Sequence, residues 1–137
     1  MILKNTDKFI VKVKNRQTNS GDTEYITERG EGTLRINDGK YYIMYKTDSA
    51  TVMIRLEMGY VNVTRVGESR SDMEYRAGKT TRFMYNTPYG TMEMELYTKS
   101  INYSISACGG EIRLRYTLCD VDNDMQIVLK KKRDDLD

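Results

Sequence analysis

The segment EIRLRYTL, residues 111–118, contains the pattern that decides the fold. Apolar and polar side chains alternate through it without interruption, so its apolar residues share one face of an extended chain. Arginines occupy the opposite face. This two-residue period is typical of an antiparallel strand with one face in a core and the other in water. The apolar set is Ile112, Leu114, Tyr116 and Leu118.

The same period recurs along the whole chain. It is clearest in KFIVKVK (8–14), TVMIRLEM (51–58), GTMEMELYT (90–98) and DMQIVLK (124–130). Turn-forming stretches such as NSGD, NDGK, EMGY and RAGK separate these segments, and no stretch shows the period of a helix of two or more turns. We therefore predict an all-β fold of about eight to ten antiparallel strands, a barrel or a sandwich, in a single domain spanning residues 1–137.

YNTPYG, residues 85–90, holds the single proline of the chain. Proline cannot donate to a strand ladder, so Pro88 should not lie inside a central strand. With proline second and glycine fourth, Thr87–Gly90 fits a type I turn. We interpret it as a structural corner between two long strands, because it holds neither a nucleophile with a base nor a metal cluster.

RGEGT, residues 29–33, places Gly30 and Gly32 within one expected strand. Glycines at such positions mark a bulge or a sharp bend, which a barrel needs in order to close. A phosphate-binding loop is the alternative, but it requires a helix after the glycines, and no helix is expected there. We predict a bend.

The two cysteines belong to the segment ACGGEIRLRYTLC, residues 107–119. If the chain turns at Gly109–Gly110, Cys108 lies beside the turn and Cys119 lies roughly 27 Å along the following strand, at ~3.4 Å per residue. A disulfide between them is then excluded, and two reduced thiols fit a cytoplasmic protein.

The composition excludes several classes of function. The 137 residues include no histidine, which removes the commonest general base and metal ligand. Lysine plus arginine number 22 and the acids 20, so the net charge of +2 makes a dedicated nucleic-acid or membrane-surface protein unlikely. Charges scattered through the first residues argue against a signal peptide, and no run of about 18 apolar residues is present. We expect a cytoplasmic protein with no metal, cofactor or membrane partner.

Arg65 is the most informative single residue. In YVNVTRVG, residues 60–67, it shares a face with Val61 and Val63, which we expect to point inward unless a one-residue bulge intervenes. A buried guanidinium needs an acid, carbonyl groups or a path to water. The first interpretation is thus an internal ion pair or a snorkelling side chain. The second is an anchor for a small, anionic ligand inside a cavity, because a barrel of this size holds one small molecule. Its polar neighbours would then be Tyr85, Thr87, Thr98 and Tyr116.

Other functions remain as alternatives. A single-stranded nucleic-acid binder would use exposed aromatic and basic residues, for which the candidates are Tyr42, Arg113, Arg115 and Lys130. A purely structural or protein-interaction module is equally compatible with the pattern. An enzyme without histidine would need a carboxylate pair, a lysine or a cysteine, but Glu93 and Glu95 lie on a solvent face and Cys119 has no expected base. We predict a protein that is not an enzyme.

The corner also carries a family resemblance. Y-x-T-P-x-G-x-x-x-M, from Tyr85 to Met94, resembles the signature of the YwiB-like family, a group of small calycin-like β-barrel proteins of unknown function found largely in Gram-positive bacteria. Further matching pieces follow in the family's order over residues 28 to 129. They are Gly30–Gly32, YIMY ending at Tyr45, Arg65–Gly67, Met73–Tyr75, Thr98 and Leu114–Leu118.

The resemblance implies a closed, calycin- or lipocalin-like barrel and no established activity. Two positions depart from the family pattern. The family often has a carboxylate shortly after the tyrosine of YIMY, whereas Lys46 and Thr47 follow here and the first acid is Asp48. Tyr75 stands where a phenylalanine is usual. An ion pair built on the family's carboxylate is therefore not expected in this chain.

Overall fold

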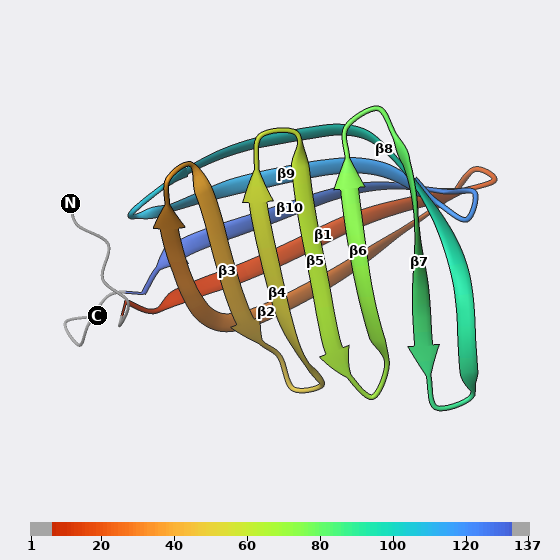
Figure 1. Cartoon of the computed structure of the whole chain (residues 1–137), viewed down its shortest axis with the longest axis horizontal. Helices are drawn as coiled ribbons and strands as arrows, with labels where there is room; N and C mark the ends of the chain where they lie inside the picture. The colour runs from red at the N-terminus through yellow and green to blue at the C-terminus, as the bar shows by residue number, and fades with distance from the viewer. Residues whose placement is uncertain (1–6, 133–137) are drawn as a thin grey trace.

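The computed structural model describes residues 7–132, and every regular element in that range is a strand (Figure 1). The alternating segments of the sequence all become strands with one buried face. The strands are β1 (Phe9–Asn19), β2 (Asp22–Asn37), β3 (Lys40–Lys46), β4 (Ala50–Glu57), β5 (Tyr60–Gly67), β6 (Arg70–Arg76), β7 (Thr80–Thr87), β8 (Gly90–Ser106), β9 (Gly109–Leu118) and β10 (Val121–Lys131).

The strands form a closed ring in which each one pairs antiparallel with the next along the chain. The ring closes where β1 pairs with β10, so that Phe9 lies opposite Lys131. Tight turns allow this order. Ser20–Gly21 and Asp38–Gly39 have positive φ angles at both residues, as two-residue type I′ hairpins require. The prediction of an all-β antiparallel barrel is confirmed, with ten strands.

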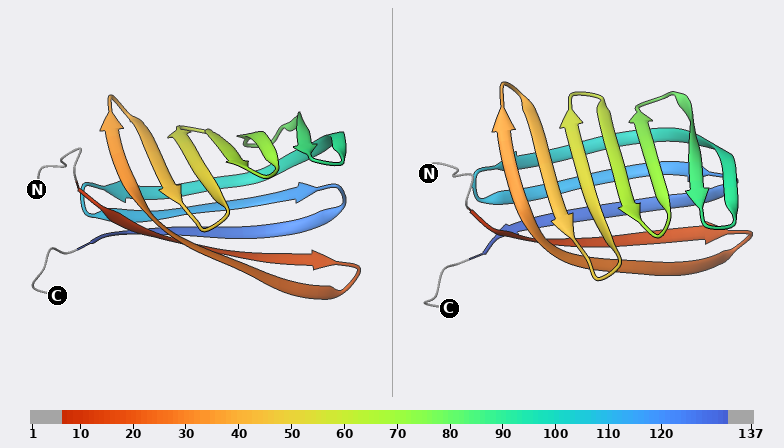
Figure 2. Two further views of the ribbon diagram at one scale, coloured as in Figure 1. Left: turned by 90° about the horizontal axis from the view of Figure 1, so that it is seen from below. Right: turned by 60° about the horizontal axis from the view of Figure 1, so that its bottom comes forward.

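Two long strands bend and join the two sides of the barrel (Figure 2). β2 pairs with β1 up to Gly32 and with β3 from Glu31 onward. At the crossing, a Cβ on Gly32 would collide with the carbonyl oxygen of Met44, so only glycine allows the backbones to approach this closely. The predicted bend is confirmed. The matching irregularity on the other side is a register shift in β8, between Thr98 and Ser100, where β8 passes from β7 to β9.

Backbone pairing between neighbouring strands is incomplete at two places in the ring, beside the first part of β2 and between β6 and β7. Residues 22–30 of β2 pair on one side only, with β1, because β3 begins its pairing at Glu31. Figure 2 shows this part of β2 diverging from strands β4–β7 toward the β1–β2 turn. At the second place, β6 and β7 share one paired position, Arg70 opposite Asn86.

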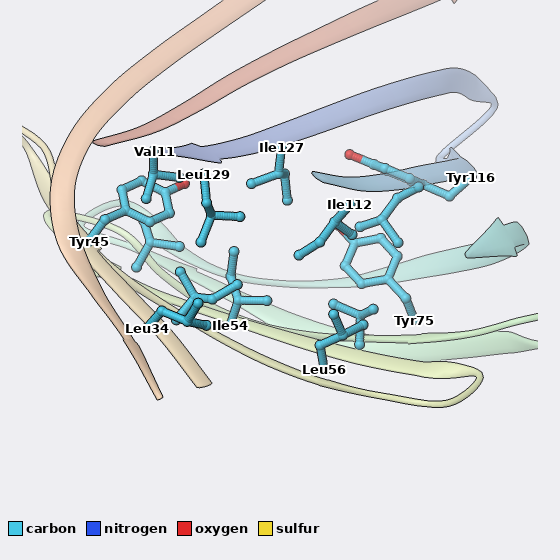
Figure 3. Packing of buried hydrophobic residues seen from close by; sticks show 14 of the residues in the cluster. Val11, Leu34, Tyr45, Ile54, Leu56, Tyr75, Ile112, Tyr116, Ile127 and Leu129 are labelled. Atoms are coloured by element: carbon cyan, nitrogen blue, oxygen red, sulfur yellow. The ribbon is translucent and has the colours of Figure 1, made fainter. Parts of the chain in front are cut away.

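One half of the interior is dry. Its inward-facing side chains are almost completely buried, with Phe9 and Val11 at 0% exposure, Leu34 and Ile43 at 1% and Leu129 at 2%. Figure 3 shows aliphatic side chains filling the space between Tyr45 at one end of this cluster and the tyrosine pair Tyr75 and Tyr116 at the other. We refer to the region around Phe9, Val11, Leu34, Ile43 and Leu129 as the packed half.

Another part of the interior is partly exposed to water. The strand register places several side chains on the inner face of the barrel although they stay partly exposed. The most exposed are Ile26, at 50%, and Met92, at 53%. We refer to this set of inward-facing residues as the open half. Its other members are Val13, Val63, Met73, Tyr85, Met94 and Met125.

The turn predicted at Pro88 is present, but the turn predicted at Gly109–Gly110 is not. Thr87 pairs with Gly90 around Pro88–Tyr89, which confirms the predicted corner. The β8–β9 turn lies at Ala107–Cys108, so the expected turn at Gly109–Gly110 was wrong. These glycines lie inside β9, where a Cβ would meet the carbonyl oxygens of Leu129 and Ser104.

The cysteines and the chain ends complete the description. Cys108 and Cys119 are exposed and form no disulfide, as expected. None of the residues described here belongs to a helix long and apolar enough to cross a membrane. The first six residues, on which part of the signal-peptide argument rests, lie outside the described range.

Candidate functional site

Arg65 points into the barrel from the end of β5. The alternation that buries Val61 at 0% exposure places Arg65 on the same face, opposite Val52 of β4. No bulge interrupts this part of β5, so the predicted orientation is confirmed. The side chain is 38% exposed, because it lies at the open half rather than in the packed half.

Arg65 is paired with an acid from the first part of β2. Its Nη1 donates to Glu28 Oε1 at 2.9 Å, and its Nη2 donates to Glu28 Oε2 at 2.5 Å. This two-pronged geometry is the strongest form of an arginine–carboxylate contact. The partners belong to β2 and β5, which share no backbone pairing. The pair therefore joins two walls of the barrel across the side of β2 that lacks a neighbouring strand. Of the two interpretations of Arg65, the internal ion pair is the one observed.

Tyr45 completes this polar cluster. Its hydroxyl donates to Glu28 Oε1 at 3.0 Å, and its ring is 3% exposed. Burial, followed by the nearby negative charge of Glu28, raises the pKa of the Tyr45 phenol well above its ordinary value. The hydrogen bonds from Arg65 lower the pKa of the Glu28 carboxyl, although burial opposes them. The cluster thus holds one negative and one positive charge near neutral pH, and its net charge is zero.

A small hollow adjoins Arg65 at the surface of the open half. Its volume is about 250 Å³. Arg65 and Tyr85 face it together with Ser71, which is opposite Arg65 in the β5–β6 pairing. The Arg65 guanidinium carries five N–H groups and uses two toward Glu28, so donors remain for another group. The full lining is Ser49, Ala50, Arg65, Gly67, Glu68, Ser69, Ser71 and Tyr85.

A second polar group lies deeper in the barrel. Thr98 of β8 and Tyr116 of β9 are directly opposite each other and are 0% and 3% exposed. The Tyr116 ring packs edge-on against Tyr75, with centroids 4.9 Å apart, and burial raises the pKa of its phenol. Among the described residues, Thr98 Oγ1 and Asn15 Oδ1 are buried side-chain atoms with no hydrogen-bond partner. Buried polar atoms are normally paired, so these two depart from the usual pattern.

Asn15 links this group to the wall formed by β1 and β10. Its Nδ2 donates to Asn123 Oδ1 at 3.0 Å, and Gln17 donates to the same oxygen at 3.0 Å. Asn15 and Gln17 follow apolar residues on the inward-facing row of β1. Asn123 belongs to the inward-facing row of β10, which also contains apolar residues. On β1 the row runs from Phe9 and Val11 to Asn15, so the polar character of the inner face increases toward this end of the barrel.

The predicted site residues divide into three groups. Arg65 and Tyr85 share the hollow. Thr98 and Tyr116 adjoin each other in the buried interior and do not line it. Thr87 belongs to the β7–β8 turn, where its Oγ1 accepts from the Tyr89 N–H at 3.1 Å and donates to the Gly90 carbonyl at 2.9 Å. The structure does not bring the Thr87 hydroxyl to Arg65.

Sequence reasoning missed Glu28, Tyr45 and Asn15. The signal for Glu28 was present, because it shares the two-residue period of Gly30 and Gly32 and therefore faces inward. Asn15 likewise continues the apolar row of β1. The absence of a carboxylate directly after Tyr45 was noted correctly, and the structure supplies the acid from β2 instead.

The structure also shows where the candidate nucleic-acid-binding residues lie. Tyr42 stacks with Arg35, whose guanidinium carbon is 5.0 Å from the ring centroid, on the side of the barrel formed by β2 and β3. Arg113 of β9 is bonded to Asp124 at 3.0 and 2.8 Å. The proposed nucleic-acid face of Tyr42, Arg113, Arg115 and Lys130 is therefore split between separate walls of the barrel. Within residues 7–132 no three acids or cysteines gather as a metal site.

These features define a class: a closed ten-stranded antiparallel β-barrel with next-neighbour connections and one open half. The chain belongs to the family described as a domain of unknown function, DUF1934, whose family model matches residues 11–127. The resemblance drawn from the YNTPYG corner is thereby confirmed.

A sequence comparison and a structure comparison support this assignment. The chain is 23% identical over 120 residues to the uncharacterized beta-barrel protein YwiB of Bacillus subtilis (strain 168), covering 85% of this chain and 84% of that protein. It is also similar to the crystal structure of the ywiB protein from Bacillus subtilis, with a TM-score of 0.87, 23% identity and 96% of both chains covered. At this identity the structural likeness shows the fold.

Proposed function

We propose that the barrel binds a small molecule at its open half and does not catalyse a reaction. The observation that carries the proposal is the exposure of inner-face apolar side chains. Met92 and Ile26 lie on the inner face of their strands yet remain 53% and 50% exposed. A barrel interior that is only structural gains stability by burying such side chains, so their exposure favours an occupant that covers them.

The polar groups of the open half set the chemistry of the ligand. Arg65 retains unused N–H donors beside Tyr85, so the ligand should carry a group that accepts hydrogen bonds. The charge of Arg65 is already balanced by Glu28, which removes the reason for expecting a net anion. We therefore infer a molecule with an apolar part and an uncharged polar group.

The size of the hollow limits what enters it. Binding pockets for drug-sized molecules occupy about 300–1,000 Å³, and the hollow beside Arg65 measures about 250 Å³. It fits the polar end of a molecule whose apolar part would extend over Met73 and Met94 of the open half. Binding rather than turnover is supported by the chemistry of the cluster, since no histidine is present and the Tyr45 phenol is held protonated.

Native mass spectrometry of gently purified protein tests this proposal. Tyr85→Phe removes one hydroxyl from the hollow. Tyr97→Phe, on the outer face of β8 and 41% exposed, is the matched control. We expect a reproducible added mass on the native protein and on Tyr97→Phe, with a smaller bound fraction on Tyr85→Phe.

A second variant separates binding from stability. Glu28→Gln combined with Arg65→Gln removes both charges and replaces them with two neutral amides, of which the one at position 65 is shorter than the arginine. We expect it to remain folded by circular dichroism and to lose the added mass. The proposal is contradicted if the mass is equal in all four proteins. It is also contradicted if the native protein carries none and no small uncharged metabolite raises its Tm.

A further inference from the structure

The outer face formed by β1, β2 and β10 carries a cluster of exposed basic side chains. Lys12, Lys14, Arg29 and Lys130 all point away from the core, because each alternates with an inward-facing residue of its strand. We refer to these residues as the basic face. It lies on the outside of the barrel, whereas the side chains of Arg65 and Glu28 face inward, although Glu28 also lines one end of the hollow described below.

Two members of the basic face oppose each other across neighbouring strands. Lys12 of β1 is directly opposite Arg29 of β2 in the pairing register. Like charges in this position destabilise a sheet. Within residues 7–132 neither forms an ion pair, and neither does Lys130. The fold thus maintains a repulsion that a single acidic residue would relieve.

Several basic side chains elsewhere on the surface have acidic partners. Arg16 and Arg113 both bond to Asp124, and Arg82 bonds to Glu93 and Glu95. Three acids lie close to the basic face, and one of them, Glu111 opposite Val128, accepts a hydrogen bond from Gln126 at 2.8 Å. Glu31 is paired with Lys132 at 3.1 Å, and Asp124 lies beyond Gln126 with its two arginines. Lys12, Arg29 and Lys130 thus bring three cations without an ion pair together on three neighbouring strands.

The basic face is hollowed. Two hollows of about 490 and 500 Å³ adjoin each other, and Lys12, Arg29 and Lys130 line both. Val128 lies in both hollows and Ile10 in one, so the cations stand along an apolar floor. A flat lipid surface would contact the rim of such a channel, whereas a flexible linear polyanion can lie within it.

An aromatic residue extends the face at one end. Tyr25 of β2 is 59% exposed, and Lys14 Nζ lies 5.0 Å from the centroid of its ring. From Ile10 to Arg16, which is opposite Tyr25, β1 spans about 20 Å at ~3.4 Å per residue. A positively charged channel with an exposed ring beside it combines the two elements that bind single strands, phosphate contact and base stacking.

We propose that the basic face binds single-stranded nucleic acid, with Lys12, Lys14, Arg29 and Lys130 contacting successive phosphates and Tyr25 stacking on a base. Of the residues first suggested from the sequence for such a role, Lys130 is the one that belongs to this surface. Because the four basic side chains point away from the barrel interior, binding here requires no ligand at the open half.

The test measures fluorescence anisotropy of labelled oligothymidylate and oligouridylate over a range of salt concentrations. The variant Lys12→Gln/Arg29→Gln removes two phosphate contacts and relieves the repulsion between the two strands. The control Lys40→Gln/Lys79→Gln removes the same charge from exposed positions on other turns. Each phosphate contact with a single strand contributes about 0.7 to the slope of log K against log salt, so the first variant should lower the slope by about 1.4.

We expect the Lys12→Gln/Arg29→Gln protein to bind about tenfold more weakly at low salt, and the control to bind like the native protein. Tyr25→Leu should weaken binding without changing the salt slope. The proposal is overturned if the native protein shows no binding at low salt or if both double variants weaken equally. Binding to phosphatidylserine vesicles without binding to either oligonucleotide also overturns it and assigns the face to membranes.

Discussion

The packed half and the open half of the barrel are built from the same alternating strands but differ in exposure. Leu129 and Met92 both face inward, yet Leu129 is 2% exposed and Met92 is 53% exposed. The difference follows from the walls around them. In the packed half, Phe9, Val11, Ile43 and Leu129 pair with strands on both sides, whereas the open half adjoins residues 22–30 of β2, which pair on one side, and the β6–β7 junction with its single paired position. Alternation decides which way a side chain points, and the pairing of the surrounding strands decides whether it is dry.

Leu129→Ala in the packed half should have the largest effect. It removes a buried side chain that neighbours Val11 and leaves a cavity. We expect the free energy of unfolding to fall by about 2–5 kcal/mol, measured by urea denaturation. A loss below about 1 kcal/mol would show that the packed half relaxes into the cavity, and the contrast between the halves would then be smaller than the exposures indicate.

Arg65→Ala tests the link that joins the walls across the open half. It leaves Glu28 partly buried with no cation. Because the pair is partly exposed and screened by water, we expect a loss of about 1–2 kcal/mol in the free energy of unfolding. The double variant Glu28→Gln/Arg65→Gln should lose less than Arg65→Ala. Equal stabilities of Arg65→Ala and the native protein would mean that the contact does not hold the walls together.

The change of unfolding free energy with pH tests the contribution of the Glu28 carboxylate. Its pKa in the folded protein is lowered from the ordinary 4.5, so the ionised carboxylate favours folding. This contribution is fully present above pH 4.5 and disappears as the pH falls through the lower, folded-state pKa. The difference in unfolding free energy between the native protein and Glu28→Gln should therefore shrink toward zero in acid. A difference that grows in acid would contradict this assignment.

Met92→Thr should have the smallest effect, although the residue faces inward. More than half of its side chain is already in water, so we expect a change within about 0.5 kcal/mol in the free energy of unfolding. The measurement is again urea denaturation, at several protein concentrations. A loss approaching that of Leu129→Ala would show that the open half is covered in solution.

Much of the fold could be predicted because its determinants are local. The period of EIRLRYTL identifies β9, Pro88 identifies a corner, and Gly30 with Gly32 identifies the bend of β2. The turn predicted at Gly109 and Gly110 was wrong for a physical reason. Glycine serves turns and close backbone contacts alike, and here the nearby carbonyls of Leu129 and Ser104 require it. Those carbonyls belong to β10 and β8, so the local sequence does not reveal them.

The candidate site was predicted only in part for the same reason. The inward direction of Arg65 follows from Val61 and Val63, its neighbours on β5. Its partner Glu28 lies 37 residues earlier, on a strand that does not pair with β5. Which inward-facing acid meets Arg65 depends on the curvature of β2 across the interior. Thr87 was assigned wrongly to the site. A threonine whose hydroxyl bonds within a turn cannot be distinguished by sequence from one whose hydroxyl binds a ligand.

The one-sided pairing of β2 has a consequence for the exchange of amide hydrogens with solvent. In residues 22–30, alternate N–H groups point toward β1, and those between them point away from any neighbouring strand. The two sets should exchange with deuterium at different rates although they belong to one continuous strand. At Glu31 and Gly32, where β1 and β3 both pair with β2, both sets have partners, and this alternation of fast and slow positions should be interrupted there.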